Sequence, residues 1–199
     1  MHFSVRTILV TLLLGGLAAP AGAQGIRRLS SGPERHGFFL GLGGGAGSAR
    51  IECDLCSDET KQGGAGWFTI GGTVSQKLRL AADLNAWTQD DNGTRTSLGT
   101  GTFAALFYPW SEGNFFLKAG VGYSHTIIND NDAGLKAEGQ GFGGAFGIGY
   151  DLRVGQELSF TPQVTVFGGN TGDVKDGGTV VLQDSKFSVA VLTLGLVFH

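Results

Sequence analysis

The sequence predicts an all-β fold: an eight-stranded antiparallel up-and-down transmembrane β-barrel. Three observations support this prediction. Eight segments alternate between bulky apolar residues and small or polar ones, which is the period of a two-faced strand. The links between these segments alternate between short and long. Charged residues make up only 16% of the chain, too few to solvate the outward faces of eight strands in a soluble protein.

Residues 1–23 have the organisation of a secretory signal peptide. Arg6 supplies a positive charge, Thr7 to Ala19 form a short apolar core, and Ala21-Gly22-Ala23 is a small-residue cleavage site. We expect a short polar arm at residues 24–36 and the barrel at residues 37–199. No later apolar run reaches 18 residues, so a membrane role would use strands.

Eight strands are predicted, and most of them have one clearly apolar face. In residues 77–86, for example, Leu80 and Leu84 share one face while Arg79 and Asp83 share the other. Pro162 lies inside a predicted strand, so we expect a bulge or a lost ladder hydrogen bond there. The predicted strands span residues 38–46, 65–74, 77–86, 96–108, 115–127, 141–152, 158–167 and 186–199.

Two features of these strands concern the outer wall and the ends of the barrel. Residues 96–108 are apolar on both faces, so their orientation stays open. Aromatic residues near strand ends, among them Trp67, Trp87 and Tyr108, are expected at the two membrane interfaces. If the apolar faces contact lipid, the sparse polar residues line a narrow interior.

The links predict how the two ends of the barrel differ. Three links are short, at residues 75–76, 109–114 and 153–157. A meander with both termini at one end places its short turns there and its longer loops at the opposite end. We therefore expect short periplasmic turns and longer extracellular loops. The longer links are residues 47–64, 88–95, 129–140 and 168–185.

The signal segment and three stretches, residues 37–45, 145–164 and 192–199, resemble the small eight-stranded outer-membrane β-barrel proteins of the OmpA-like or opacity-like superfamily. The resemblance covers nearly the whole mature chain and implies a place in the bacterial outer membrane. It implies contact with outer-membrane lipid and lipopolysaccharide, and recognition of the C-terminal strand by the barrel-assembly machinery. The chain ends in His199 after Phe198, whereas such barrels end in the aromatic residue itself. The family has no common catalytic residues, and we expect no enzymatic activity.

A polar network is predicted inside the barrel. Lys77, Arg79, Asp83 and Lys118 fall on polar strand faces, and charges in a narrow lumen must pair or stay hydrated. We expect these side chains to plug the lumen. The alternative is a gate or a narrow ion path, although an eight-stranded barrel has little room for a channel.

Cys53 and Cys56 form a C-x-x-C motif and are the only cysteines. In an exported protein they favour a small structural disulfide in the first outer loop, with metal or thiol chemistry as alternatives. A zinc site needs about four ligands, and this motif supplies two. The glycine-rich residues 41–47 imitate a dinucleotide-binding motif, but no helical pattern follows them. We therefore expect neither a cofactor nor a metal.

Several function classes remain open. The leading hypothesis is a structural or surface-interaction role in the outer membrane. A lipid-modifying hydrolase on the same scaffold is an alternative, for which Ser124, His125 and Asp130 are candidate residues. A soluble exported barrel that binds an apolar ligand is a third. The net charge of −3 gives no electrostatic basis for binding nucleic acid.

Overall fold

The computed structural model describes residues 35–52, 60–130, 134–176 and 179–199. It is all-β, as predicted. No helix in these ranges is long and apolar enough to cross a membrane. The strands are β1 (Phe38–Glu52), β2 (Thr60–Ser75), β3 (Leu78–Asp91), β4 (Thr94–Phe107), β5 (Phe115–Asp130), β6 (Leu135–Tyr150), β7 (Leu152–Arg153), β8 (Leu158–Asp176) and β9 (Thr179–Phe198).

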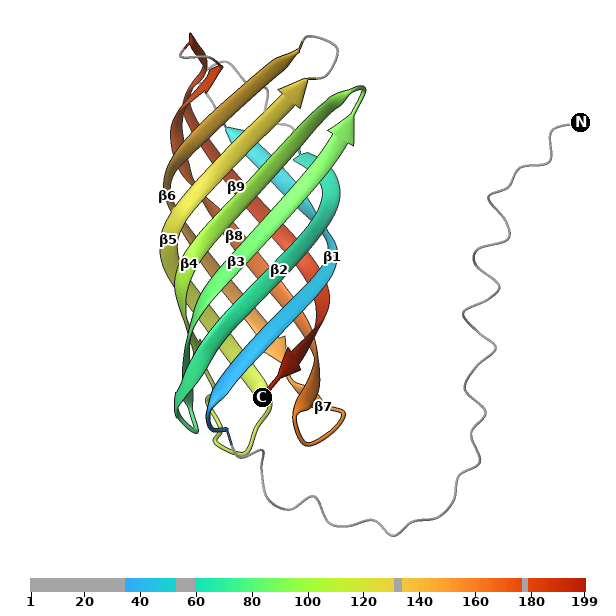
Figure 1. Cartoon of the computed structure of the whole chain (residues 1–199), viewed down its shortest axis with the longest axis vertical. Helices are drawn as coiled ribbons and strands as arrows, with labels where there is room; N and C mark the ends of the chain where they lie inside the picture. Colours follow the sequence, from blue (N-terminus) through green and yellow to red (C-terminus); the bar gives the residue numbers. More distant parts are fainter. Residues whose placement is uncertain (1–34, 53–59, 131–133, 177–178) are drawn as a thin grey trace, which may run out of the picture. The chain divides into compact units, whose positions relative to one another are not determined.

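The strands form one closed antiparallel ring (Figure 1). Each of β1 to β5 pairs with the next strand, β6 pairs with β8, and β8 pairs with β9. The pairing of β9 with β1 closes the ring, and the two-residue β7 prolongs the β6 wall beside β8. The predicted eight-stranded up-and-down barrel is confirmed. Within the described residues, closure gives each long strand a partner on both sides.

The barrel has two ends, the terminal end and the hairpin end. The terminal end holds Arg35, His199 and the links at residues 76–77, 108–114 and 151–157. The hairpin end is the opposite one, where β3 turns into β4 at Asn92-Gly93. In Figure 1 the C-terminus marks the terminal end.

The structure corrects the predicted strand boundaries at the hairpin end. The eight long strands have 14 to 20 residues each, and much of the sequence assigned to loops continues as paired strand. Residues 88–95 contain only a two-residue turn, in which Asn92 and Gly93 have φ angles of 48° and 86°. Positive φ at both central residues is the geometry of a type I′ hairpin. These extensions are rich in glycine, serine, threonine and charged residues and have few large apolar ones, so they lack the regular apolar face that marks the rest of the strands.

Buried and exposed side chains alternate along the long strands, and this alternation shows which side chains face the interior. In β4, Leu98 and Leu106 are buried inside while Phe103 and Phe107 are exposed on the outer wall, which decides the orientation that the sequence left open. Three aromatic residues expected at the membrane interfaces are instead buried: Trp67, Trp87 and Tyr108.

Pro162 lies where strand pairing is interrupted, as expected from its missing backbone donor. On one side, β8 pairs continuously with β9 past Pro162. On the other side, β6 pairs as far as Gly149 opposite Gln163, and pairing resumes in β7 at Leu152 opposite Phe160. The gap falls opposite Pro162.

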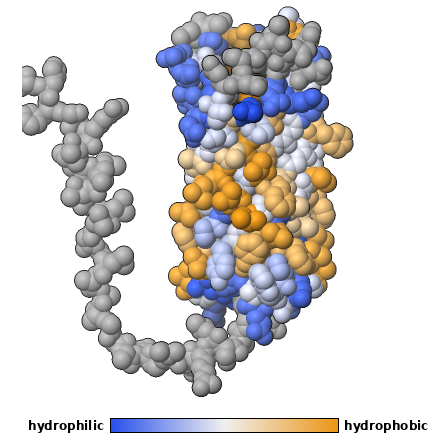
Figure 2. Space-filling model, turned by 180° about the vertical axis from the view of Figure 1, so that it is seen from behind, coloured by the Kyte–Doolittle hydropathy of each residue, from blue (hydrophilic) through white to orange (hydrophobic). Residues whose placement is uncertain are grey.

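The outer wall is apolar over a broad band (Figure 2). On the face that Figure 2 shows, this band lies between hydrophilic zones at the two ends of the barrel. Large apolar side chains are exposed on all eight long strands; Phe38 and Phe142 are each 85% exposed. Soluble monomers rarely expose contiguous apolar surface of this extent. On β9 the outward residues are Leu192, Leu194, Leu196 and Phe198.

Candidate functional site

The interior of the barrel contains two groups of packed apolar side chains. The group toward the terminal end contains Phe39, Trp67, Ala81, Leu106, Tyr108, Phe116 and Val197. The second group contains Ala49, Trp87, Leu98, Ala145, Phe167, Phe187, Val189 and Val191. Glycines lie beside several of these residues, and the side chains that they lack leave space for the aromatic rings.

The glycines explain how large rings fit inside a narrow barrel. A Cβ on Gly43 or Gly195 would lie within 2.5 Å and 2.3 Å, respectively, of atoms of the Trp67 indole. A Cβ on Gly149 would lie 2.3 Å from the Phe116 ring. These distances are shorter than any normal contact, so each ring packs directly on glycine backbone.

A buried ion pair joins β3 and β5. Lys118 Nζ donates to both carboxylate oxygens of Asp83, at 3.2 Å and 3.0 Å. Asn85 Nδ2 donates to the same carboxylate at 2.7 Å. Asp83 and Lys118 are 1% and 2% exposed, so both charges have lost nearly all contact with water. A buried pair of this kind needs such additional hydrogen bonds, because desolvating two charges is expensive.

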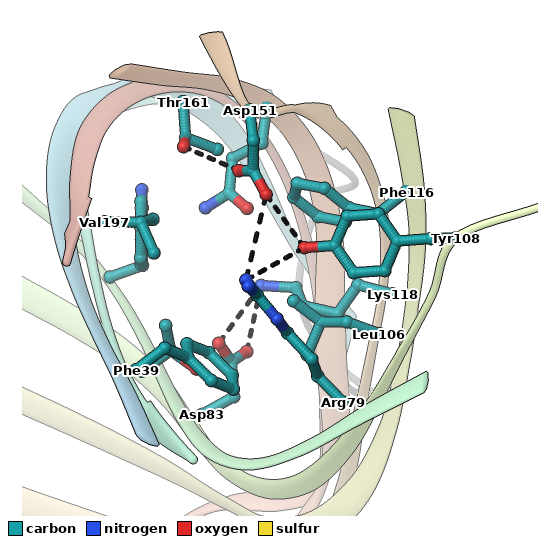
Figure 3. A pocket seen from close by; sticks show the side chains of 13 residues that line it. Phe39, Arg79, Asp83, Leu106, Tyr108, Phe116, Lys118, Asp151, Thr161 and Val197 are labelled. Atoms are coloured by element: carbon teal, nitrogen blue, oxygen red, sulfur yellow. Dashed lines mark hydrogen bonds and ion pairs between the residues drawn. The ribbon is translucent and has the colours of Figure 1, made fainter. Parts of the chain in front are cut away.

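A second buried polar cluster surrounds Tyr108 (Figure 3). The Tyr108 hydroxyl donates to Asp151 Oδ2 at 2.8 Å and accepts from Arg79 Nη1 at 3.3 Å. Arg79 Nη1 also lies 3.9 Å from Asp151 Oδ2, and Thr161 Oγ1 donates to Asp151 Oδ1 at 2.8 Å. Burial, aided by the Asp151 carboxylate, raises the pKa of Tyr108, so its hydroxyl stays protonated and donates.

Three of the four residues predicted for the interior network are therefore inside the barrel: Arg79, Asp83 and Lys118. Lys77 is not. It lies in the exposed turn between β2 and β3, because β3 begins one residue later, at Leu78. Tyr108 and Asp151 also belong to the interior network, and they were not among its predicted members. Alternation places Tyr108 on the same face as Leu106, but the sequence left the orientation of that segment open.

The C-terminal residue turns its ring into the terminal end of the barrel. His199 Nδ1 lies 3.0 Å from Arg79 Nη2, and His199 Nε2 lies 2.8 Å from Ser159 Oγ. Burial, reinforced by the positive charges of Arg79, Arg153 and Arg35, lowers the pKa of His199 to about 3. The ring is therefore neutral, with Nδ1 accepting from Arg79 and Nε2–H donating to Ser159.

This geometry bears on the hydrolase hypothesis. A serine nucleophile needs a histidine nitrogen that accepts its proton, whereas His199 Nε2 already carries a hydrogen. Of the candidates from the sequence, Ser124 faces the interior and donates to the carbonyls of Phe142 and Asn170. His125 is the next residue on the same strand, so its ring points to the outer wall. Ser124 and His125 cannot form a hydrogen-bonded pair.

Arg35 is the residue that sequence reasoning missed most clearly. It belongs to the predicted polar arm, yet it is 3% exposed. Its guanidinium carbon lies 3.8 Å from the centre of the Tyr108 ring. The guanidinium also donates to the backbone carbonyls of Gln76, Ser111 and Gly113. The pattern of the sequence gives no signal for this position.

Little free space remains among these groups. The cavity lined by Trp67, Arg79, Asp83, Lys118 and Asp151 has a volume of about 10 Å³, enough for one water molecule. Small-molecule sites typically measure about 300–1,000 Å³. Within the described ranges, no group of three or more histidine, cysteine, aspartate or glutamate side chains could hold a metal ion. Cys53 and Cys56, and residues 1–34 with the predicted signal peptide and most of the arm, lie outside the described residues.

Comparison with known proteins gives matches by structure only. No protein-family model and no curated protein sequence matches the chain. Neisserial surface protein A superposes with a TM-score of 0.55 at 15% identity, covering 83% of this chain and 98% of that one. Ail, the attachment invasion locus protein of Yersinia pestis, superposes with a TM-score of 0.59 at 9% identity, covering 83% and 100%. With its closed ring of eight strands, the chain has the fold of small outer-membrane β-barrel proteins.

Proposed function

We propose that the protein is an integral β-barrel of the bacterial outer membrane with a structural or surface-interaction role, and that its lumen is closed by its own side chains. One observation carries the proposal: the apolar and polar faces are inverted relative to a soluble protein. The exposed wall is apolar, while charged residues such as Arg79, Asp83 and Lys118 lie buried inside.

The membrane assignment rests on the outer wall. A membrane-spanning strand needs about 9–11 residues, and the long strands here have at least 14. The barrel is thus long enough to cross the hydrocarbon layer and to continue beyond it as a polar sheet. We assign the terminal end to the periplasm, because it holds both ends of the barrel, and the hairpin end to the outside.

The proposed partners follow from this orientation. The apolar wall contacts outer-membrane lipid, and the polar wall above it contacts lipopolysaccharide. Pairs such as Arg95–Asp90 and Lys136–Glu138 lie at the hairpin end, where a surface interaction would take place. The C-terminal strand, which pairs with both β1 and β8, is the segment that the barrel-assembly machinery would read.

The closed lumen distinguishes this proposal from a channel and from a soluble ligand carrier. The two polar clusters and the apolar group at the terminal end fill the cross-section there, and the cavity among them measures about 10 Å³. A hydrated ion or an apolar ligand does not fit into that space. The Lys118–Asp83 pair would have to separate before ions could pass, and each buried charge would then lose its partner.

The first experiment is electrophoresis of the mature protein from fractionated membranes, unheated and boiled, in mild detergent. A closed membrane barrel resists detergent, so the unheated and boiled samples should migrate differently, and the protein should sit in the outer-membrane fraction. The second is planar-bilayer recording, in which the purified protein should give no conductance. A soluble periplasmic protein without a mobility shift contradicts the membrane assignment, and steady conductance contradicts the closed lumen.

A further inference from the structure

The terminal end of the barrel contains a site built around one guanidinium group. This group belongs to Arg35, which lies three residues before the first residue of β1 and yet is almost completely buried. Its side chain contacts two links that are far apart in the sequence: the turn at residues 76–77 and the link at residues 108–114.

The site supplies what a planar cation needs. The Tyr108 ring lies against the guanidinium, with 3.8 Å between the guanidinium carbon and the ring centre. The backbone carbonyls of Gln76 and Ser111 each accept from Nη1 at 3.0 Å, and the carbonyl of Gly113 accepts from Nη2. Carbonyl oxygens arranged around an aromatic face match the fixed donors and flat surface of a guanidinium, and match an ammonium ion poorly.

The backbone of Arg35 is held as well. Its N–H donates to Gln76 Oε1 at 2.9 Å, and Gln76 Nε2 donates to its carbonyl at 3.0 Å. The Tyr108 hydroxyl donates to the Asp151 carboxylate, whose negative charge is partly offset by Arg79, with its guanidinium carbon 5.4 Å from the centre of the same ring.

We propose that the terminal end is a guanidinium-binding site whose resident ligand is Arg35, so that this one side chain holds the two links together. When the Arg35 side chain is removed, the ring and the carbonyl groups of the site remain, and they bind a guanidinium compound from solution. The proposal concerns the barrel itself and does not depend on its role in the outer membrane.

The test is chemical rescue of the full mature chain folded in detergent micelles. Arg35→Ala removes several buried hydrogen bonds to a charged group, so the Tm should fall by about 5 °C. Methylguanidinium at millimolar concentration should restore most of that loss in Arg35→Ala and leave the wild-type Tm unchanged. Methylammonium at the same ionic strength should restore nothing. Lys77→Ala removes an exposed cation from the neighbouring turn and serves as the control, with an unchanged Tm.

Limited trypsin digestion provides a second measurement if Arg35→Ala folds poorly. The Arg35–His36 bond should resist cleavage in the folded wild type, because the arginine side chain is buried. Gln76→Ala removes the paired hydrogen bonds to the Arg35 backbone and should speed that cleavage at least several-fold. Equal rescue by methylammonium, or cleavage of the folded wild type as fast as of the boiled protein, overturns the proposal.

Discussion

At the scale of single residues, Asp83 and Asp151, the buried carboxylates of the described barrel interior, each have several partners. Asp83 has Lys118 and Asn85, and Asp151 has Tyr108, Thr161 and, more distantly, Arg79. Buried charges are tolerated only with such partners, since an uncompensated charge in an apolar interior loses its hydration without replacement.

The Lys118–Asp83 pair gives a direct test of this statement. Lys118→Met leaves the Asp83 carboxylate buried without its cation, and the free energy of unfolding should fall by about 3–5 kcal/mol. The double variant Lys118→Met with Asp83→Asn removes both charges and should recover most of the loss. Urea unfolding in lipid vesicles measures all three proteins. A single variant as stable as the wild type would show that the pair is hydrated rather than buried.

His199 makes the stability of the terminal end depend on pH. Its pKa falls from the ordinary 6.5 to about 3 in the folded protein, so the folded state favours the neutral ring. The contribution is complete above pH 6.5 and declines as the pH falls from 6.5 toward 3, because the unfolded chain takes up the proton first. Titration through this range should therefore destabilise the wild type.

The matched variant is His199→Gln, whose amide can accept from Arg79 and donate to Ser159 without titrating. The Tm of His199→Gln should depend less on pH than that of the wild type between pH 6.5 and 3. His125→Gln is the control, because the His125 ring lies on the outer wall away from the arginines. If His199→Gln and the wild type lose stability in parallel as the pH falls, the His199 ring is not the cause of the pH dependence.

At the scale of the strands, glycine decides what the barrel can contain. The Trp67 side chain of β2 fits inside the barrel because Gly43 in β1 and Gly195 in β9 leave room for its indole. Glycine has no such role on the outer wall, where a Cβ on Gly72 would meet no atom within 4 Å.

These two environments give a matched pair of substitutions. Gly195→Ala forces a Cβ into the Trp67 ring and into the Leu42 carbonyl, so it should lower the free energy of unfolding by about 1–3 kcal/mol or more. Gly72→Ala is the same chemical change in open space and should be neutral within about 0.5 kcal/mol. Thermal unfolding monitored by gel mobility compares them. Equal effects of the two substitutions would contradict the packing argument.

Strand ends show what local signals can predict. Asn92-Gly93 between two alternating segments is the strongest short-range signal for a hairpin, and it marks the β3–β4 turn within a region interpreted as a loop. The other extensions offer no equivalent signal, because they have few large apolar residues and their pairing depends on neighbouring strands.

At the scale of the whole molecule, the outer wall is the feature that selects an environment. Val121, in the middle of β5, is 75% exposed and surrounded by other apolar residues of the wall. In water such a wall would drive association, and in a bilayer it contacts hydrocarbon.

A charge placed on the wall therefore separates the two environments. Val121→Arg should destabilise the barrel in lipid vesicles by about 2–4 kcal/mol, as expected for a cation near the bilayer midplane. Thr88→Arg places the same side chain on the exposed wall nearer the hairpin end and should change stability by less than about 1 kcal/mol. A neutral effect at Val121 would mean that the wall faces water.

The sequence alone determined the number of strands, their antiparallel order and the faces of those strands with one bulky apolar side. The period of two is a local property, so Leu80 and Leu84 identify an outward face, and Arg79 and Asp83 an inward one, without knowledge of any neighbour. The eight-stranded ring follows from the number and order of these segments.

The tertiary structure decided what fills the ring. The orientation of β4, apolar on both faces, is fixed only by the strands on either side. The interior position of Trp67 depends on glycines in β1 and β9. Arg35 and His199 are positioned by Tyr108 and Arg79, which lie about 70 and 120 residues away in the chain. The alternation of residues along one strand shows which of its sides is apolar. Residues that contact one another across the barrel are far apart in the sequence and come together only when the ring closes.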